Sequence, residues 1–368
     1  MEVVWNENGC QNKVVYWLDS LSADEFENLA ESCDNLTIWY SNNVDDEIYK
    51  RYEELISYTE LNGYWKGIAG SRIVDLTLSK EEILNGFSKT RKYKTRRALE
   101  RDNLHTSFVF EYSKENLAMY EDFYNQFADG KGLGRLNTLK VSAMMKNGQF
   151  VLANIKNEKD ETVVVNAYVV DTEKKRVSLF SSSSLYRENR ECAALIGRAN
   201  SMLHYQSMLY FKELGFKEYD MGGVYLGKEE GVNSDYINIR NFKGSLGGKL
   251  VKFENGFSLP VRDIRRINAK VNLFREELKN NKVIIWGAAK YGRYVIRLLR
   301  EIGIEPELVI DNRLANKENN LYEQSVLAST NADEYIILVT TLVDNYEKIA
   351  KENITQEYVN RNKLICVR

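Results

Sequence analysis

Hydrophobic and polar positions alternate or recur with regular spacing along the middle of the chain, and the pattern predicts a definite order of elements. Residues 72–79 alternate as a strand does, and Ser79 with Glu82 matches the S-x-x-E capping box that begins a helix. Residues 104–113 again predict a strand, and residues 114–128 predict a helix. The chain therefore opens this region with strand and helix in alternation.

Three strand-like runs separated by charged turns follow between residues 150 and 184, which is the pattern of an antiparallel meander. Residues 191–215 have helical periodicity and end at a glycine suited to a helix C-cap. A short strand then ends at the segment 220–223, Asp-Met-Gly-Gly, and a second strand-like run closes at 242–244, Phe-Lys-Gly. This order predicts an α+β fold with a mixed sheet rather than a repeat array.

Proline and charge mark the later boundaries of the chain. Pro260 precedes a charged helical stretch, residues 261–280, which we interpret as a connecting segment. The resulting prediction has four parts, namely residues 1–70, 71–260, 261–280 and 281–368.

The last of these parts carries a glycine-rich turn between a buried strand and an amphipathic helix. Gly287, Ala289 and Gly292 occupy the three positions of G-x-G-x-x-G, and Asp311 follows at the end of the next strand, where a ribose-binding acid is expected. Residues 334–341 supply a third strand, predicted to be parallel. The pattern predicts a small α/β, Rossmann-like unit that binds a nucleotide, and its alternative is a βαβ unit whose tight turn holds no ligand.

Composition narrows the function classes. The 368 residues contain 51 Lys+Arg and 53 Asp+Glu, a net charge of −2, so attraction to polyanions must come from local patches. Four cysteines without a CxxC pair and only two histidines, His105 and His204, argue against a zinc site, a disulfide scaffold or a Ser-His-Asp triad. We predict no metal, and we expect His204 to be packed rather than catalytic. Without a signal sequence or an apolar run of membrane-spanning length, we expect a cytoplasmic protein with no transmembrane segment.

One local patch is strongly basic. Residues 88–101 hold seven cations and a single carboxylate, Glu100. The cations are Lys89, Arg91, Lys92, Lys94, Arg96, Arg97 and Arg101. Such a run is either a solvated helix face or a contact for phosphate groups, such as those of tRNA or of a nucleotide-linked sugar.

Three segments in this order resemble a known family. They are RKYKTRRALERDNL (91–104), FKELGFKEYDMGG (211–223) and NFKGSLGGKL (241–250). Roughly residues 70 to 258 resemble the FemAB/FemX aminoacyltransferases and the related polysaccharide-associated acetyltransferases. The resemblance implies a GNAT-type (acyl-CoA N-acyltransferase-like) domain at 71–260, and a partial GNAT unit is one interpretation of residues 1–70.

The resemblance also implies an activity and its partners. Such proteins transfer an acyl or aminoacyl group to an amine during peptidoglycan or surface-polysaccharide assembly. The implied co-substrate is acyl-CoA or aminoacyl-tRNA, with no tightly bound cofactor. The acyltransferase resemblance implies a cell-wall precursor as the partner, with tRNA as a further candidate. Residues 281–368 resemble nucleotide-binding domains attached to sugar-modifying acyl- and methyltransferases, which implies a nucleotide-linked sugar as the partner.

Acyl transfer to an amine needs a group that takes a proton and donors for the developing oxyanion. Gly222 and Gly223 would let a ligand lie against exposed backbone amides, or they form a bulge at the sheet. Asp220 is a candidate base, or a carboxylate satisfied by nearby amides. Lys243 matches the lysine of the family's Phe-Lys pair and is our main catalytic candidate; we expect it after a strand, and a solvated surface lysine is the alternative.

Further substrate-binding candidates surround these residues. Tyr225 and Phe242 lie beside the two glycines and the lysine in sequence, and Arg96 and Arg97 belong to the basic run. Arg187 and Arg190 fall where acetyl-CoA-dependent relatives carry a glycine-rich pyrophosphate loop, but the glycines are missing here. Their absence weakens the acetyl-CoA interpretation and leaves aminoacyl-tRNA or another acyl donor open.

The sequence therefore predicts an N-acyltransferase acting on the amine of a sugar-linked or cell-envelope precursor. Two other hypotheses remain beside it. The first is an aminoacyl-tRNA-dependent aminoacyltransferase of the FemX type. The second is a non-catalytic scaffold that binds a nucleotide.

Overall fold

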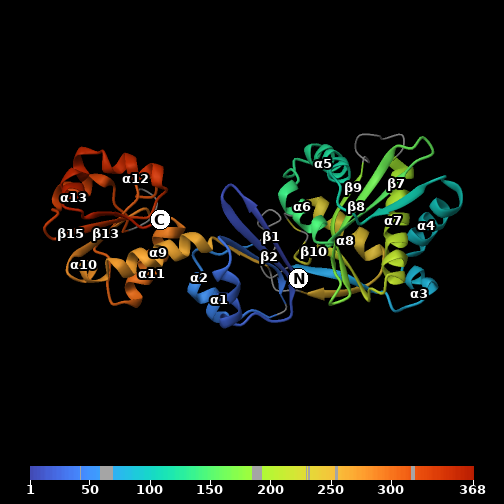
Figure 1. Ribbon diagram of the computed structural model, residues 1–368, viewed down its shortest axis with the longest axis horizontal. Coiled ribbons are helices and arrows are strands. Elements are labelled where there is room, and N and C mark those ends of the chain that lie inside the picture. The colour runs from blue at the N-terminus through green and yellow to red at the C-terminus, as the bar shows by residue number, and fades with distance from the viewer. Residues whose placement is uncertain are drawn as a thin grey trace. The chain divides into compact units, whose positions relative to one another are not determined.

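The computed structural model describes residues 1–41, 43–58, 69–184, 193–228, 230, 233–252, 256–315 and 320–368. The chain forms two compact units (Figure 1). The first unit contains Met1–Asp19, Ile38–Asn43 and Tyr58–Gly256, and the second contains Ser20–Thr37, Val44–Ser57 and Phe257–Arg368. The predicted four-part division remains a prediction, because a compact unit is not by itself a separately folding domain. No helix in the described ranges is long and apolar enough to cross a membrane.

The first unit contains a seven-stranded sheet in the order β11-β5-β10-β9-β8-β7-β6. Its strands are β5 (Ala69–Asp75), β6 (His105–Val109), β7 (Phe150–Lys156), β8 (Thr162–Asp171), β9 (Arg176–Ser184), β10 (Glu218–Tyr225) and β11 (Lys249–Lys252). Neighbouring strands are antiparallel except β9 and β10, which run parallel. The predicted α+β class with a mixed sheet is confirmed.

Side chains of this sheet alternate between two cores. Along β7, Phe150 and Leu152 enter one apolar cluster, and Val151 and Ala153 enter the other. Helices α3 (Lys80–Asn85), α4 (Lys89–Arg101) and α7 (Ala193–Glu213) contribute to the second cluster. Helices α5 (Lys114–Asp129) and α6 (Thr138–Lys146) and the hairpin of β1 (Glu2–Glu7) with β2 (Cys10–Leu18) contribute to the first. Both faces of the sheet are therefore covered, as the buried pattern of β7 and β8 requires.

Most predicted elements of this unit are present, and one is wrong. The capping box of Ser79 and Glu82 is formed, and Gly215, at φ +83°, follows α7 as the predicted C-cap. The run expected as a second strand is instead helix α8 (Ser234–Ser245). Asn233 begins it by accepting a hydrogen bond from the Asp235 amide at 2.9 Å, a side-chain cap that the sequence-based interpretation overlooked.

The second unit includes α1 (Ala23–Glu31), α2 (Asp46–Tyr52), β12 (Phe257–Leu259), α9 (Val261–Leu273) and α10 (Arg275–Lys279). The charged stretch at 261–280 is helical, as predicted, and α9 buries Val261, Ile264, Ile267 and Val271 along one stripe. Strands β3 (Asn35–Ser41) and β4 (Ser57–Tyr58) each extend across a boundary between the chain segments of the two units.

A four-stranded parallel sheet forms the core of the later part of the second unit, in the order β14-β13-β15-β16. Its strands are β13 (Lys282–Trp286), β14 (Leu308–Ile310), β15 (Tyr335–Val339) and β16 (Leu364–Cys366). The helices are α11 (Lys290–Glu301), α12 (Val343–Ala350) and α13 (Gln356–Asn360), with 3₁₀ turns η1 (Gln324–Ser329) and η2 (Asn353–Thr355). The three predicted parallel strands are confirmed, and β16 is an additional one.

Candidate functional site

The parallel pairing of β9 with β10 is short and ends at a bulge. It joins Arg176–Ser178 to Glu218–Asp220, and β9 then continues to Ser184 along β8 alone. On the other side of β10, the pairing with β5 shifts register between Asp220 and Gly223. The bulge that was one of the two interpretations of the double glycine is therefore present.

Gly222 owes its lack of a side chain to the neighbouring strand. Its φ is +72°, and a Cβ built there would lie 2.8 Å from the carbonyl oxygen of Leu179 in β9. Its amide donates to Asp220 Oδ1 at 2.8 Å, and its carbonyl accepts from Ser71 Oγ at 2.9 Å. The expectation that the Gly222 amide faces a ligand is therefore wrong, because both backbone groups are used inside the sheet.

Asp220 is the anchor of this bulge. Its side chain is fully buried, and Oδ1 accepts hydrogen bonds from Ser71 Oγ and from the Gly222 amide. Desolvation raises the pKa of Asp220, and the hydrogen bonds from Ser71 and Gly222 act in the opposite direction. Oδ2 is also buried but has no hydrogen-bond partner in the described part of the chain, so only one of the two carboxylate oxygens is satisfied internally. The burial of Asp220 argues against direct contact with a substrate amine, and its role as a base remains a prediction.

Lys243 lies in the last turn of α8, not after a strand as we expected. Its Nζ donates to the carbonyl oxygen of Gly223 at 2.8 Å and lies 3.6 Å from the position of a Gly222 Cβ. Burial lowers the pKa of Lys243 to about 8, and the charge of Asp220 partly opposes this shift. Lys243 is therefore a partly buried cation held at the bulge by its hydrogen bond to Gly223, unlike a freely solvated surface lysine.

The surroundings of Lys243 are aromatic and basic. Phe242 is partly buried, and the Arg91 guanidinium stacks 4.5 Å above its ring. Arg91 also donates to Ser245 Oγ at 3.0 Å and to Ser201 Oγ at 2.8 Å, so this member of the basic run ties α4 to α8 and α7.

His204 behaves as predicted, as a packed residue. It is 1% exposed, and Nδ1 shares a hydrogen bond of 2.7 Å with the hydroxyl of Tyr219. Burial, assisted by the charges of Lys243 and Arg91, lowers the pKa of His204 to about 3. The imidazole is thus neutral at physiological pH and carries no charge into the site.

The remaining candidates near the bulge have different positions. Tyr225 is buried, and its hydroxyl donates to the Lys228 carbonyl at 3.0 Å, an internal contact. Gly223 is partly exposed, and its carbonyl is the acceptor for Lys243. Arg187 and Arg190 lie outside the described residues.

The basic run forms an exposed face of α4. A depression of about 540 Å³ is lined by Asn85, Lys89, Lys92, Tyr93, Arg96, Arg97, Glu100 and Arg101. Tyr93 is 61% exposed among these cations, and Arg97 lies 3.8 Å from Asp102. We call this surface the α4 face; a phosphate contact on it remains a prediction.

In the second unit, the glycine turn is closely packed. At Gly287, φ is +111° and a Cβ would lie 2.7 Å from Thr340 Oγ1; at Gly292, a Cβ would lie 1.7 Å from the Gly287 carbonyl. Asp311 Oδ2 accepts from the Ala288 amide at 3.0 Å. The structure thus brings Gly287, Gly292 and Asp311 together, with Ala289 as the residue before α11.

The strand order of that sheet adds a feature that the sequence did not reveal. In the sheet, β13 lies between β14 and β15. The crossover from β13 to β14 and the later crossover to β15 therefore lead to opposite sides of β13, and they diverge between β13 and β15. Ligands of open α/β sheets bind where such crossovers diverge, at the carboxyl ends of the strands. Thr341, the second residue after β15, has a buried hydroxyl without a hydrogen-bond partner in the described part of the chain.

The sequence matches no known family profile, and no curated protein sequence matches it. Among solved structures, the chain is similar to FemX, with 12% identity and a TM-score of 0.46 over 74% of this chain and 89% of that one. It is also similar to L-PGS from Bacillus licheniformis, with 14% identity and a TM-score of 0.43 over 70% and 80% of the two chains. A third similar structure is the C-terminal domain of a putative lysylphosphatidylglycerol synthetase from Agrobacterium fabrum. Its sequence identity is 13% and its TM-score is 0.40, over 73% of this chain and 88% of that one. At these identities and scores, the function has to be argued from the site itself.

Proposed function

We propose that the chain is an N-acyltransferase, which transfers an acyl group from an activated donor to an amine. The observation that carries this proposal is the partly buried Lys243 ammonium, which the Gly223 carbonyl holds at 2.8 Å close to where the pairing of β9 and β10 ends. A carbonyl under attack develops negative charge, and a cation held in place beforehand stabilises that charge most when water is excluded. With a pKa of about 8, Lys243 is still mostly protonated at neutral pH.

The proposed reaction is a direct attack. The amine nitrogen bonds to the acyl carbonyl carbon, Lys243 stabilises the oxyanion, and the bond to the leaving thiol or tRNA hydroxyl breaks. The proton of the amine passes to solvent or to the leaving group, since Asp220 is fully buried. No covalent bond to the protein is needed.

The donor and acceptor follow from the sequence-based interpretation and remain proposals. The donor is acyl-CoA or an aminoacyl-tRNA, and the acceptor is the amine of a nucleotide-linked sugar or other cell-envelope precursor. The exposed α4 face favours the tRNA donor as a second candidate, because Tyr93 and its neighbouring cations suit a phosphate backbone with stacked bases.

Ligand-induced stabilisation tests the proposal. The full chain is mixed separately with acyl-CoAs, charged tRNA and UDP-sugars, and its Tm is measured. We expect one donor to raise Tm, and that donor to lose its acyl group in the presence of an amine, seen as thiol release or tRNA deacylation. Stabilisation by UDP-sugars alone, without turnover of any donor, would instead support the scaffold hypothesis.

Neutralising part of the α4 face is expected to weaken donor binding. Arg96→Ala with Arg97→Ala removes two cations, so the slope of log Kd against log salt should fall by about 1 to 2. Fluorescence titration of labelled tRNA or of acyl-CoA across a salt series measures this slope. Arg135→Ala is the control, because this exposed arginine is paired with Asp129. Equal slopes in the wild type and the double variant would identify the α4 face as merely solvated.

The second unit is proposed to bind a nucleotide at the 287–292 turn, with Asp311 accepting from a ribose hydroxyl. Asp311→Ala should abolish any nucleotide-dependent rise in Tm. It should also lower the ligand-free stability by about 1 kcal/mol, since the Ala288 amide loses its acceptor. Asp344→Ala, at an exposed carboxylate of α12, is the control. If UDP, ADP and NAD all leave the wild-type Tm unchanged, the tight turn is structural only.

A further inference from the structure

One arginine of the basic run is turned into the protein and is not among the residues that line the α4 face. The guanidinium of Arg91 stacks 4.5 Å above the ring of Phe242. It also donates to Ser245 Oγ at 3.0 Å and to Ser201 Oγ at 2.8 Å. Phe242 directly precedes Lys243 in the last turn of α8, and Ser245 follows it by two positions. The partners of Arg91 therefore flank Lys243 on both sides along the chain.

The backbone reinforces the same junction. The Ser88 amide donates to the Ser245 carbonyl at 2.9 Å, and Ser88 Oγ caps α4 by accepting the Arg91 amide at 3.3 Å. Ser245 Oγ in turn donates to the Phe242 carbonyl at 2.6 Å. The turn that carries Lys243 is thus fixed to the start of α4 by side-chain and main-chain contacts together.

Stability alone does not explain why this position carries a charge. In the part of the chain that the structure describes, no carboxylate lies within ion-pair distance of Arg91, so its partners are two hydroxyls and one ring. Burial lowers the pKa of Arg91, which means that the surroundings disfavour the charged form. A neutral side chain of similar length would fill the same space without this desolvation cost. The guanidinium therefore needs a reason other than stability, and its contacts around Lys243 supply one.

We propose that Arg91 is a positioning residue for Lys243. It holds the last turn of α8 against α4 and α7, so that the ammonium stays on the Gly223 carbonyl at 2.8 Å. A cation that stabilises a transition state has to be fixed in advance, because a displacement on the order of 1 Å can lower the rate about 100-fold. Arg91 and the cations of the α4 face belong to one helix, so a donor bound there contacts the helix that holds Lys243 in place. This inference rests on the proposed function.

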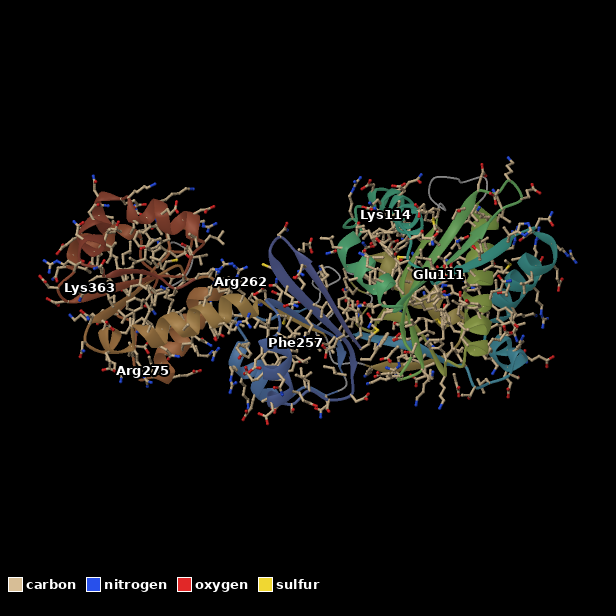
Figure 2. The ribbon with its side chains drawn as sticks, viewed as in Figure 1. Glu111, Lys114, Phe257, Arg262, Arg275 and Lys363 are labelled. Carbon is tan, nitrogen blue, oxygen red and sulfur yellow. The ribbon has the colours of Figure 1, made fainter. Side chains whose placement is uncertain are left out.

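Hydrogen exchange tests the positioning without any measurement of activity. The full chain and Arg91→Met are compared by mass spectrometry in the absence of ligand. Methionine keeps an apolar side chain on Phe242 but loses both hydrogen bonds, so the amides of residues 242–247 should exchange at least about 10-fold faster. Arg275→Met, at an exposed arginine of α10 (Figure 2), is the matched control and should leave this segment unchanged. Equal exchange in the wild type and Arg91→Met would overturn the proposal.

Kinetics of acyl transfer show whether Arg91 acts through Lys243. We expect Arg91→Met to lower kcat about 10- to 100-fold and to change KM by less than about threefold. Its Tm should change little, because an uncompensated charge is removed. Arg91→Lys keeps a cation that can donate to one serine, so it should restore part of kcat. In a Lys243→Ala background, Arg91→Met should change kcat by less than about twofold, since the group that it positions is gone.

The outcomes separate this inference from the proposed function. If Lys243→Ala lowers kcat but Arg91→Met does not, Arg91 is only a structural contact and the proposed function stands. An undiminished effect of Arg91→Met in the Lys243→Ala background would also overturn the positioning role, because Arg91 would then act independently of Lys243. If Lys243→Ala itself retains kcat, the proposed role of Lys243 fails, and the positioning role fails with it.

Discussion

Replacing Lys243 with alanine is expected to lower kcat by on the order of 10²–10³, with a much smaller change in KM. The reason is that an ammonium aimed at developing charge binds the transition state more strongly than the ground state. Lys243→Arg should restore little, because the Gly223 carbonyl accepts a compact ammonium at 2.8 Å and a planar guanidinium places its charge elsewhere.

The pH dependence provides a second readout for Lys243. Its charged form predominates below a pKa of about 8, so wild-type kcat should fall as the pH rises through that value. The descending limb should be missing in Lys243→Ala. Lys252→Ala, at an exposed lysine of β11, is the matched control and should keep both kcat and the pH profile. A folded Lys243→Ala protein with nearly wild-type kcat would remove this residue from the mechanism.

The elements that the sequence predicted correctly are those with strong local signals. Helix α5, helix α7 and the meander of β7, β8 and β9 each carry a long periodic pattern and a recognisable turn or cap. Helix α8 was misassigned because its run is short and its cap, Asn233, is a single side chain. Local patterns of that length fit a strand and a helix about equally well.

The candidate site was less accessible to sequence reasoning, because its decisive contacts join distant segments. Ser71 and Asp220 are 149 positions apart, and only the register of β5 against β10 brings them together. Lys140 likewise lies near aromatic rings from three strands, those of Trp5, Tyr16 and Phe180. By contrast, the spacing of Gly287 and Gly292 is local to one turn, so the sequence alone predicts the glycine-rich turn there.

Two substitutions distinguish the two roles considered for Asp220, structural anchor of the bulge and general base. If this carboxylate anchors the bulge, Asp220→Asn keeps an acceptor for Ser71 and for the Gly222 amide, and it removes a buried charge. Desolvation raises the pKa of Asp220, so the folded state binds a proton more tightly than the unfolded state. Above the folded-state pKa the carboxyl is charged, and its buried charge destabilises the fold. Asp220→Asn should therefore stay within about 1 kcal/mol of the wild type at pH 7 and retain kcat.

Asp220→Ala should behave differently. The Gly222 amide loses its acceptor inside the sheet and a cavity opens beside it, so we expect unfolding to become easier by about 2–4 kcal/mol. Denaturant titration gives the stability of both variants, and thiol release or tRNA deacylation gives their kcat. If Asp220 only anchors the bulge, the loss of kcat should match the loss of stability. Asp220→Asn should then be active, and Asp220→Ala should be impaired. If Asp220→Asn folds normally yet loses 10²-fold or more in kcat, on the order expected for a missing general base, the carboxylate takes part in proton transfer after all.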